Sequence, residues 1–331
     1  MGKMIRIVRM QWFSLALVAA FLVSWAAPWV GVGINPGNHT QYWAIVTIFF
    51  LSGLILPTRE AFAGLLNWRV HVFINLFQFV LVPLGAWLAL KPFRDSLDPG
   101  LLAGFCLLAA LPTTISSCVT FTQISGGNVA ASLFNAAAGN IAGIAITPAL
   151  LFLMLGGKAD HSRLDIVATI LSLTRQVIVP FFIGQAIYLA AGGRTKHWRK
   201  KVASFNSFLI ILIVFTAFSD TFAHTERLGG FSLANPRFVA PLAALLPIHL
   251  AVLATVAGLS RAFRFNPSDR VAIFYTASQK TLSLGLPMAT ATLGANPRLL
   301  GLAILPIIVY HPIQLLVAGM LRRPAAASKH Q

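Results

Sequence analysis

The sequence predicts an all-α integral membrane protein of about ten transmembrane helices, and three observations lead to this fold class. Hydrophobic residues make up 57% of the 331 residues and charged residues only 10%, a composition outside the range of soluble globular domains. Apolar stretches of about 20 residues recur along the chain, and each is long enough to cross the hydrocarbon core as a helix. Segments of about 10 residues with alternating polarity, which a transmembrane β-barrel requires, do not occur in the sequence.

Ten apolar spans follow one another along the chain, separated by short polar connections. The longest connection, Gly192–Lys201, is too short for a soluble domain, so we expect a single transmembrane domain over residues 1–331. Lys3, Arg6 and Arg9 precede the first span in the manner of a signal peptide. Its cleavage would leave one half of the chain a span short, so we expect the first helix to be retained. The spans begin near Trp12, Gln41, Val70, Gly100, Asn128, Leu164, Ser204, Phe238, Asp269 and Arg298.

The net charge of +17 is explained by topology rather than by a nucleic-acid partner. If the N-terminus is cytoplasmic, alternation places the basic residues of segments 194–201 and 261–270 on the cytoplasmic side, where only Glu60 and Asp269 oppose them. Acidic residues nearly balance the basic ones on the other side. The positive-inside rule therefore predicts a multi-pass protein of the plasma or inner membrane with both termini cytoplasmic. We expect membrane lipids and a small solute as partners, and no nucleic acid.

The spans divide into two halves of five, and an odd number of spans per half requires any structural repeat to be inverted in the membrane. We expect the repeats at approximately residues 12–157 and 163–323. The fourth span, LLAGFCLLAALPTTISSCVTFTQ, and the ninth, VAIFYTASQKTLSLGLPMATATL, both carry a polar middle and a proline, Pro112 or Pro287. Unpaired backbone at membrane depth is tolerated only against protein or a watery cavity. The sequence therefore predicts broken helices four and nine that cross at a shared site, although prolines and hydroxyls also serve as simple kinks and packing contacts.

Two basic residues lie inside spans, Arg175 in the sixth and Lys280 in the polar middle of the ninth. A charge near the bilayer centre costs about 2.5 to 3.5 kcal/mol on insertion scales, so such residues usually have a function. Positive charge at the crossing favours a small anionic solute, which predicts a secondary transporter of an organic anion. The alternative for Arg175 is a structural one, in which neighbouring carbonyl groups brace its side chain.

Uncharged polar residues inside the spans add hydrogen-bonding groups to the predicted site. Asn135 lies three residues after Ser132, so both share one helical face. Asn140 is a further polar residue of the fifth span, and His249 and His311 are interpreted as hydrogen-bonding partners between helices. The expected substrate and ion-binding residues are Gln78, Ser116, Ser117, Ser132, Asn135, Arg175, Ser278, Gln279, Lys280 and Thr281.

Catalytic and metal-binding patterns are missing from the sequence. It contains no GxSxG or HExxH motif, no pair of intramembrane carboxylates and no Walker motif. Cys106 and Cys118 suggest neither a disulfide nor a metal site. We therefore expect no enzymatic activity, no catalytic residues, no bound metal and no cofactor, which leaves Na⁺ or H⁺ as the candidate coupling ion.

Several segments resemble one known family. The run LPTTISSCVTFTQISGGNVAASLFNAAAGNIAGIAITPALL resembles the fourth and fifth helices of the bile acid:sodium symporter superfamily, and ASQKTLSLGLPMA with YHPIQLLVAG resembles its ninth and tenth. NWRVHVFINLFQFVLVP and RQVIVPFFIGQ are similar to the branch of the seventh member of solute carrier family 10 and its bacterial relatives. The resemblance extends from about Phe13 to Arg322.

The resemblance implies a core domain of helices three to five and eight to ten, which moves against a panel domain of helices one, two, six and seven. It also implies that substrate binds where the broken helices cross. By motif, Gln78 and Gln279 match two glutamines of the sodium sites, and Ser132 matches the fifth-helix serine. Ser117 with Cys118, or Ser116 with Ser117, occupies the region of the family's Ser-Asn pair.

The sequence departs from the sodium sites of the family at two positions. The sodium-binding glutamate aligns near Tyr275, and the fifth-helix threonine aligns with Ala136, so neither sodium site is complete. Lys280 stands where an asparagine is expected, directly after Gln279. We hypothesise that its ammonium group takes over part of the role of sodium. A displaced sodium site remains an alternative, as does a membrane regulator of calcium homeostasis, a role associated with this branch in eukaryotes.

Overall fold

The computed structural model describes residues 2–56, 67–156, 171–172, 174–192, 194–223, 236–293 and 297–321. All regular structure in these residues is helical, and no strand occurs among them. Within the described residues, five helices are long and apolar enough to cross a membrane, and the number rises to seven if each of two bent helix pairs counts as one span. These helices confirm an all-helical chain of membrane type, while the ten-span topology and the inverted repeats stay predictions.

The two bent pairs have different local causes. Leu15–Ala26 is followed by α2 (Pro28–Ile34) at an angle of 102°. The proline at the first position of α2 disfavours helical backbone at Ala27, which has φ −140° and ψ 64°. The second pair, α7 (Pro99–Ala110) and α8 (Ile115–Ile124), is bent by 50° and contains the polar segment of the predicted fourth span. The predicted start of the sixth span, near Leu164, lies outside the described residues.

The chain forms two compact units, each made of three separate stretches of sequence. Unit 1 consists of Met1–Leu56, Leu171–Ser232 and Thr290–Leu302. Unit 2 consists of Pro57–Ile170, Leu233–Ala289 and Ala303–Gln331.

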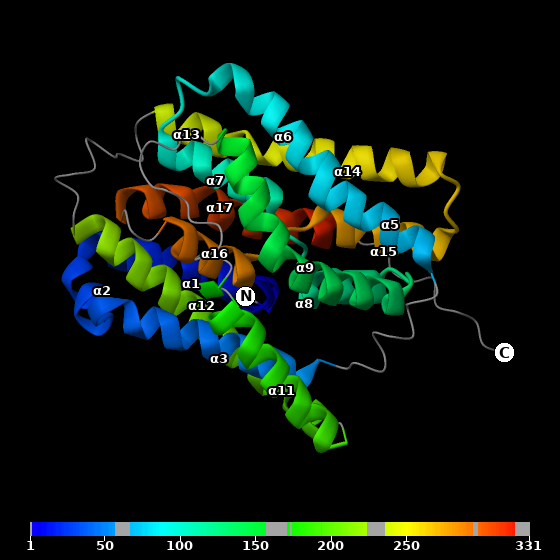
Figure 1. Ribbon diagram of the computed structural model, residues 1–331, viewed down its shortest axis with the longest axis horizontal. Coiled ribbons are helices and arrows are strands. Elements are labelled where there is room, and N and C mark those ends of the chain that lie inside the picture. The colour runs from blue at the N-terminus through cyan, green and yellow to red at the C-terminus, as the bar shows by residue number, and fades with distance from the viewer. Residues whose placement is uncertain are drawn as a thin grey trace. The chain divides into compact units, whose positions relative to one another are not determined.

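Unit 1 is built on two close helix pairs (Figure 1), α3 with α11 and α1 with α12. In the first pair, Gly53 lies against the carbonyl group of Phe181, and Gly184 lies against the carbonyl group of Phe50. In the second pair, the ring of Phe21 packs edge-on against Phe218 and Phe222 of α12. Glycine allows the first pair to approach at backbone distance. The elements of unit 1 are α1 (Gly2–Ala26), α2, η1 (Pro36–Asn38), α3 (His39–Ile55), η4 (Thr174–Ile178), α11 (Val179–Ala190), η5 (Arg194–Trp198) and α12 (Arg199–Ala223).

Unit 2 is organised around the long helix α9 (Val129–Leu155), which contacts α5, α7, α8 and α15 (Figure 1). Its apolar core includes Val70, Ile74, Ala131, Val256 and Ile273, which come from α5, α9, α14 and α15. The other elements are α5 (Trp68–Leu76), η2 (Phe77–Leu81), α6 (Val82–Leu90), η3 (Lys91–Phe93), α13 (Pro236–Ala243), α14 (Leu245–Ala262), α15 (Pro267–Ser278), α16 (Leu282–Leu293) and α17 (Pro297–Leu321), the last two of which also contribute residues to unit 1.

One buried carboxylate joins the beginnings of three helices of unit 2. Asp269 is 5% exposed and accepts hydrogen bonds from the side-chain amides of Asn67, Asn128 and Asn266 at 2.6 to 2.8 Å. These asparagines directly precede α5, α9 and α15. A negative charge is favourable at helix N-termini, so Asp269 stabilises all three ends together.

We expect Gly184→Ala to destabilise unit 1, because its new methyl group would meet the backbone of Phe50 and Leu54. Forced overpacking of this kind costs about 1 to 3 kcal/mol. The matched control is Gly258→Ala on α14, an exposed position where the added atom meets nothing within 4 Å. Thermal unfolding in detergent should give a lower midpoint for Gly184→Ala only. Equal midpoints for both variants would contradict the close packing of α3 on α11.

Candidate functional site

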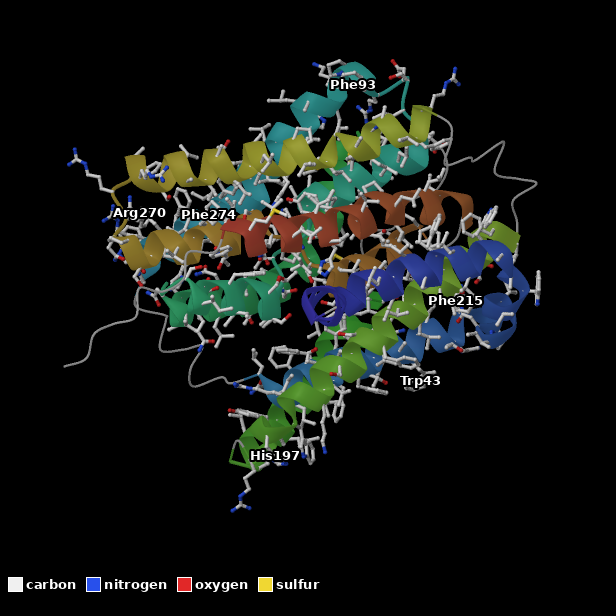
Figure 2. The ribbon with its side chains drawn as sticks, turned by 180° about the vertical axis from the view of Figure 1, so that it is seen from behind. Trp43, Phe93, His197, Phe215, Arg270 and Phe274 are labelled. Carbon is white, nitrogen blue, oxygen red and sulfur yellow. The ribbon has the colours of Figure 1, made fainter. Side chains whose placement is uncertain are left out.

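Two interrupted helices of unit 2 meet at their breaks. Helix α7 ends at Ala110 and α8 begins at Ile115, and residues 111–114 between them are not helical, with extended backbone at Leu111 and Thr114. Helix α15, along which Figure 2 labels Arg270 and Phe274, ends at Ser278, and α16 begins at Leu282. The breaks are joined directly, because the backbone N–H of Thr281 donates to the carbonyl oxygen of Pro112 over 2.9 Å.

The two breaks have different origins in the sequence. Pro112 has no N–H to continue α7, and it favours extended backbone at Leu111, which has φ −63° and ψ 145°. The second break contains no proline, because Pro287 lies inside α16. Contacts with other helices must therefore hold residues 279–281 extended.

Every backbone carbonyl from Ala109 to Thr113 has a hydrogen-bond donor. Such accounting matters in a membrane protein, because water is not available to pair these groups. The donors come from α9 and from the second break. Lys280 donates to Ala109 and Leu111, Thr147 Oγ1 to Ala110 (2.9 Å), the Thr281 N–H to Pro112, and Asn140 Nδ2 to Thr113 (2.8 Å).

The ammonium group of Lys280 lies at the centre of this arrangement and is only 4% exposed as a residue. Its Nζ donates to the carbonyl oxygens of Leu111 at 2.7 Å, Ala109 at 2.8 Å and Gln78 at 3.4 Å. An ammonium group has three N–H donors, and all three have carbonyl acceptors here. Lys280 therefore acts as a fixed cation in a cage of backbone oxygens.

The third acceptor of Lys280 is available because of a π-helical turn. In η2 the N–H of Val82 donates to Phe77, five residues earlier. With that spacing the carbonyl of Gln78 faces Pro83, which has no N–H to give. The carbonyl of Gln78 is thus left for Lys280.

The side chain of Gln314 holds the second break extended. This residue of α17 is fully buried, and its amide pairs with both backbone groups of Lys280. The Lys280 N–H donates to Oε1 at 2.7 Å, and Nε2 donates to the Lys280 carbonyl at 2.8 Å. Tyr310 of the same helix donates to the Ser278 carbonyl at 3.2 Å. Side chains of α17 thus replace the helical partners that the break removes.

Gln279 connects the second break to the start of α8. Its Oε1 accepts from Ser117 at 2.6 Å and from Thr114 at 3.0 Å, and Thr114 and Ser117 are also hydrogen-bonded to each other. Its Nε2, the hydroxyl of Thr113 and Oε1 of Gln78 are buried and have no hydrogen-bond partner in the structure. Unsatisfied polar groups at the breaks mark where a polar ligand can be bound.

Two polar clusters of unit 2 contain the other predicted residues of α9. Ser132 contacts Thr276 Oγ1 at 2.8 Å and Thr122 Oγ1 at 3.3 Å, which links α9 to α15 and α8. Asn135 Nδ2 lies 2.8 Å from His71 Nδ1, and Asn135 Oδ1 accepts from Asn75 at 3.3 Å.

The remaining predicted residues differ in their surroundings. Ser278 is buried, and its hydroxyl donates to the Phe274 carbonyl of its own helix at 2.6 Å. Ser116 is exposed in the first turn of α8. Arg175 belongs to unit 1, where it is exposed within the π-helical turn η4. The structure thus gathers Gln78, Ser117, Gln279, Lys280 and Thr281 at the crossing, with Ser132 and Asn135 in adjoining clusters.

Sequence reasoning missed the residues that hold the crossing together from α9 and α17. Thr147, Tyr310 and Gln314 were not among the predicted site residues, although a glutamine in an apolar span is a signal in its own right. Asn140 was noted as a polar residue of the fifth span but not as a site residue. His249 Nδ1 lies 2.7 Å from the Tyr310 hydroxyl, so this histidine supports the second break from α14.

Comparison with known proteins agrees with this architecture. Residues 11–327 match the SBF-like CPA transporter family. The chain belongs to this family. Sodium/bile acid cotransporter 7 of Rattus norvegicus is 32% identical over 96% of this chain and 93% of its own. The putative symporter YfeH of Escherichia coli K12 is 31% identical, with 94% and 91% covered, and the uncharacterized protein PA2026 of Pseudomonas aeruginosa is 32% identical, with 93% and 91% covered.

The family settles the broad class of the protein. The chain is a multi-pass membrane transporter of the bile acid:sodium symporter superfamily and not an enzyme.

We expect Gln314→Leu to destabilise the protein, because it leaves the N–H and the carbonyl of Lys280 buried without partners. An unsatisfied buried group costs about 1 to 3 kcal/mol. The matched control is Gln176→Leu, which loses only a contact with Ser172 one turn earlier in the sequence. Thermal unfolding should give a clearly lower midpoint for Gln314→Leu than for Gln176→Leu. Similar midpoints would mean that the second break does not depend on the glutamine.

Proposed function

We propose that this transporter carries a small organic anion by alternating access at the crossing of the two broken helices, without a coupling sodium ion. The observation that carries the proposal is the Lys280 ammonium group with its three carbonyl acceptors. Backbone oxygens at a helix break are typical ligands for a coupling cation in transporters with broken helices. Here a side chain of the protein supplies the positive charge permanently.

The positions that would hold sodium in sodium-coupled relatives support the same proposal. By the resemblance, these positions include Ala136 and Tyr275, and Cys118 in one of the two alignments of the family's Ser-Asn pair. All three belong to one buried cluster with Ala318, and the ring of Tyr275 stacks on Phe121 at 5.6 Å between centroids. Sodium, like other hard cations, requires several oxygen ligands and usually a carboxylate. A thiol, a methyl group and a stacked phenol do not supply that set.

An anionic substrate is supported by the hydrogen-bonding groups at the crossing. Gln279 Nε2 and the Thr113 hydroxyl are free to donate, and a carboxylate only accepts. Helices α8 and α16 both begin at the breaks, so their N-terminal N–H groups and partial positive charge lie at the same place. Ser116 in the first turn of α8 adds an exposed hydroxyl. Lys280 contributes charge, but its donors are already used within the protein.

The proposed transport cycle uses the two units as moving parts. Unit 2 contains the crossing and corresponds to the core domain implied by the resemblance, and unit 1 corresponds to the panel domain. The proposal includes inverted repeats at approximately residues 12–157 and 163–323 and cytoplasmic termini in a plasma or inner membrane. We also propose that Arg175 of unit 1 attracts the anion.

A sodium-coupled symporter is the second candidate, favoured by the names of the relatives, a sodium/bile acid cotransporter and a putative symporter. A displaced sodium site would have to use oxygens such as Gln78 Oε1, which is buried without a partner. Ser132 would be the natural further ligand, since it matches the family serine. The two candidates differ in their response to sodium.

Purified protein screened against organic anions should be stabilised equally in sodium and in choline buffers. A ligand at a hundredfold excess over its Kd adds about 2.7 kcal/mol to the free energy of unfolding. The readout is the thermal unfolding midpoint, followed by uptake of the stabilising anion into proteoliposomes. Uptake that requires sodium and fails in Ser132→Ala would establish the symporter instead.

Lys280→Ala should be less stable than wild type, because three carbonyl oxygens lose their donor at about 1 to 3 kcal/mol for each buried group left unpaired. Methylammonium or sodium should restore part of the lost stability by entering the vacated cage, whereas choline is too large. Lys91→Ala, at an exposed lysine with a cation–π contact to Trp87 at 5.7 Å, is the matched control and should show a smaller loss and no rescue. If neither cation raises the unfolding midpoint of Lys280→Ala, the cage is not a cation site.

A further inference from the structure

A small hollow lies between α1 and α12 in unit 1. Its volume is about 340 Å³, at the lower end of the range for small-molecule pockets. It exists because α1 presents alanine side chains where α12 presents large ones. Phe215, labelled in Figure 2, belongs to the α12 wall. The lining residues are Ala16, Ala19, Ala20, Val23, Phe208, Ile211, Leu212 and Phe215.

The chemistry of the hollow suits a hydrocarbon chain. All of its lining side chains are apolar, so it offers no hydrogen bond to a polar guest. Phe208 is 55% exposed and Val23 is 51% exposed, so the hollow opens on the surface of unit 1. An apolar surface of this kind contacts lipid in a membrane transporter.

A lysine lies in line with the hollow on α12. Lys201, Phe208, Leu212 and Phe215 are spaced by seven, four and three residues, which puts them on one helical stripe. Lys201 is exposed, and a rise of 1.5 Å per residue puts it about 10 Å along the helix from Phe208. A basic group one to two turns beyond an apolar groove matches the order of phosphate and acyl chain in a phospholipid.

The residues around Lys201 are typical of the interface between lipid headgroups and hydrocarbon. Trp198, one turn earlier, is 44% exposed, and tryptophan concentrates at the boundary between headgroups and hydrocarbon. The segment from Arg194 to Ser219 contains five basic residues and no aspartate or glutamate. Positive charge at this end of α12 therefore favours an anionic headgroup.

The same end of α12 is held in a fixed position. Thr195 donates to the Leu54 carbonyl at 2.7 Å, and Arg199 Nε donates to the Ile55 carbonyl at 3.3 Å, both at the C-terminus of α3. Lys201 thus projects from an anchored helix start rather than from a free loop.

We propose that one anionic phospholipid binds unit 1, with its phosphate at Lys201 and an acyl chain in the hollow between α1 and α12. The chain fills the space left by Ala16, Ala19 and Ala20 and joins the two helices. Lys201 favours anionic over zwitterionic lipid, since only an anionic headgroup places net negative charge beside its ammonium group. This site is independent of the crossing in unit 2.

The test uses the full-length protein in detergent and two lipids with identical acyl chains, phosphatidylglycerol and phosphatidylcholine. Native mass spectrometry measures the binding of each lipid. Wild type should bind phosphatidylglycerol more tightly. Lys201→Gln should weaken the binding of phosphatidylglycerol by about fivefold, the effect of one basic residue at an anionic surface, and leave the binding of phosphatidylcholine unchanged. Ala19→Leu, at an exposed lining position, should weaken both lipids by filling the hollow.

Each variant has a matched control. Arg261→Gln removes an exposed charge from α14 of unit 2, outside the basic segment 194–201, and Ala203→Leu adds the same bulk on the opposite face of α12. Both should bind like wild type. If Ala19→Leu fails to fold, Phe208→Ala removes one wall and should weaken both lipids. Equal binding of the two lipids by wild type, or equal losses in variants and controls, would overturn the proposal.

Discussion

The cage of carbonyl oxygens around Lys280 is the constraint on which the rest of unit 2 depends. Two helices broken at membrane depth expose backbone groups that water cannot reach, and each such group must find a partner within the protein. The Lys280 ammonium group serves two carbonyls of the first break and one of the π-helical turn η2. One side chain therefore joins three segments that are distant in sequence. Polar side chains of α9 and α17 pair the remaining backbone groups at the two breaks.

A lysine differs from a bound ion in one respect that matters for transport. Sodium can leave its site, so its gradient can drive a cycle, whereas an ammonium group on the chain stays in either state of the protein. If Lys280 holds the crossing permanently, the energy for uptake comes from the solute's own gradient or from an ion bound elsewhere. The apolar cluster of Cys118, Ala136 and Tyr275 agrees with a fixed cation, since a protein that binds no sodium at this place needs no carboxylate ligand there.

The sequence predicted the helical membrane class and the two polar segments because apolar length and mid-span polar residues are local signals. It also singled out Lys280, since a charge at membrane depth is costly. Its role as a donor to the protein's own backbone was beyond prediction, because the acceptors depend on how α7 and η2 pack. Gln314 was missed for the same reason, and Pro287, expected near the second break, lies inside α16.

The two units solve the problem of polar backbone in a membrane differently. In unit 1 polar contacts gather at helix ends, as where Thr195 and Arg199 pair the last carbonyls of α3. Its helices also meet through glycine and aromatic contacts and through hydrogen bonds of Gln41 to Thr216 and of Asn206 to Ser52. In unit 2 polar contacts lie both at helix starts, around Asp269, and in the middle of the spans where the helices are interrupted. Unit 1 can present an apolar surface to lipid, as at the hollow between α1 and α12, while the backbone groups freed by the breaks of α7–α8 and α15–α16 are paired within unit 2.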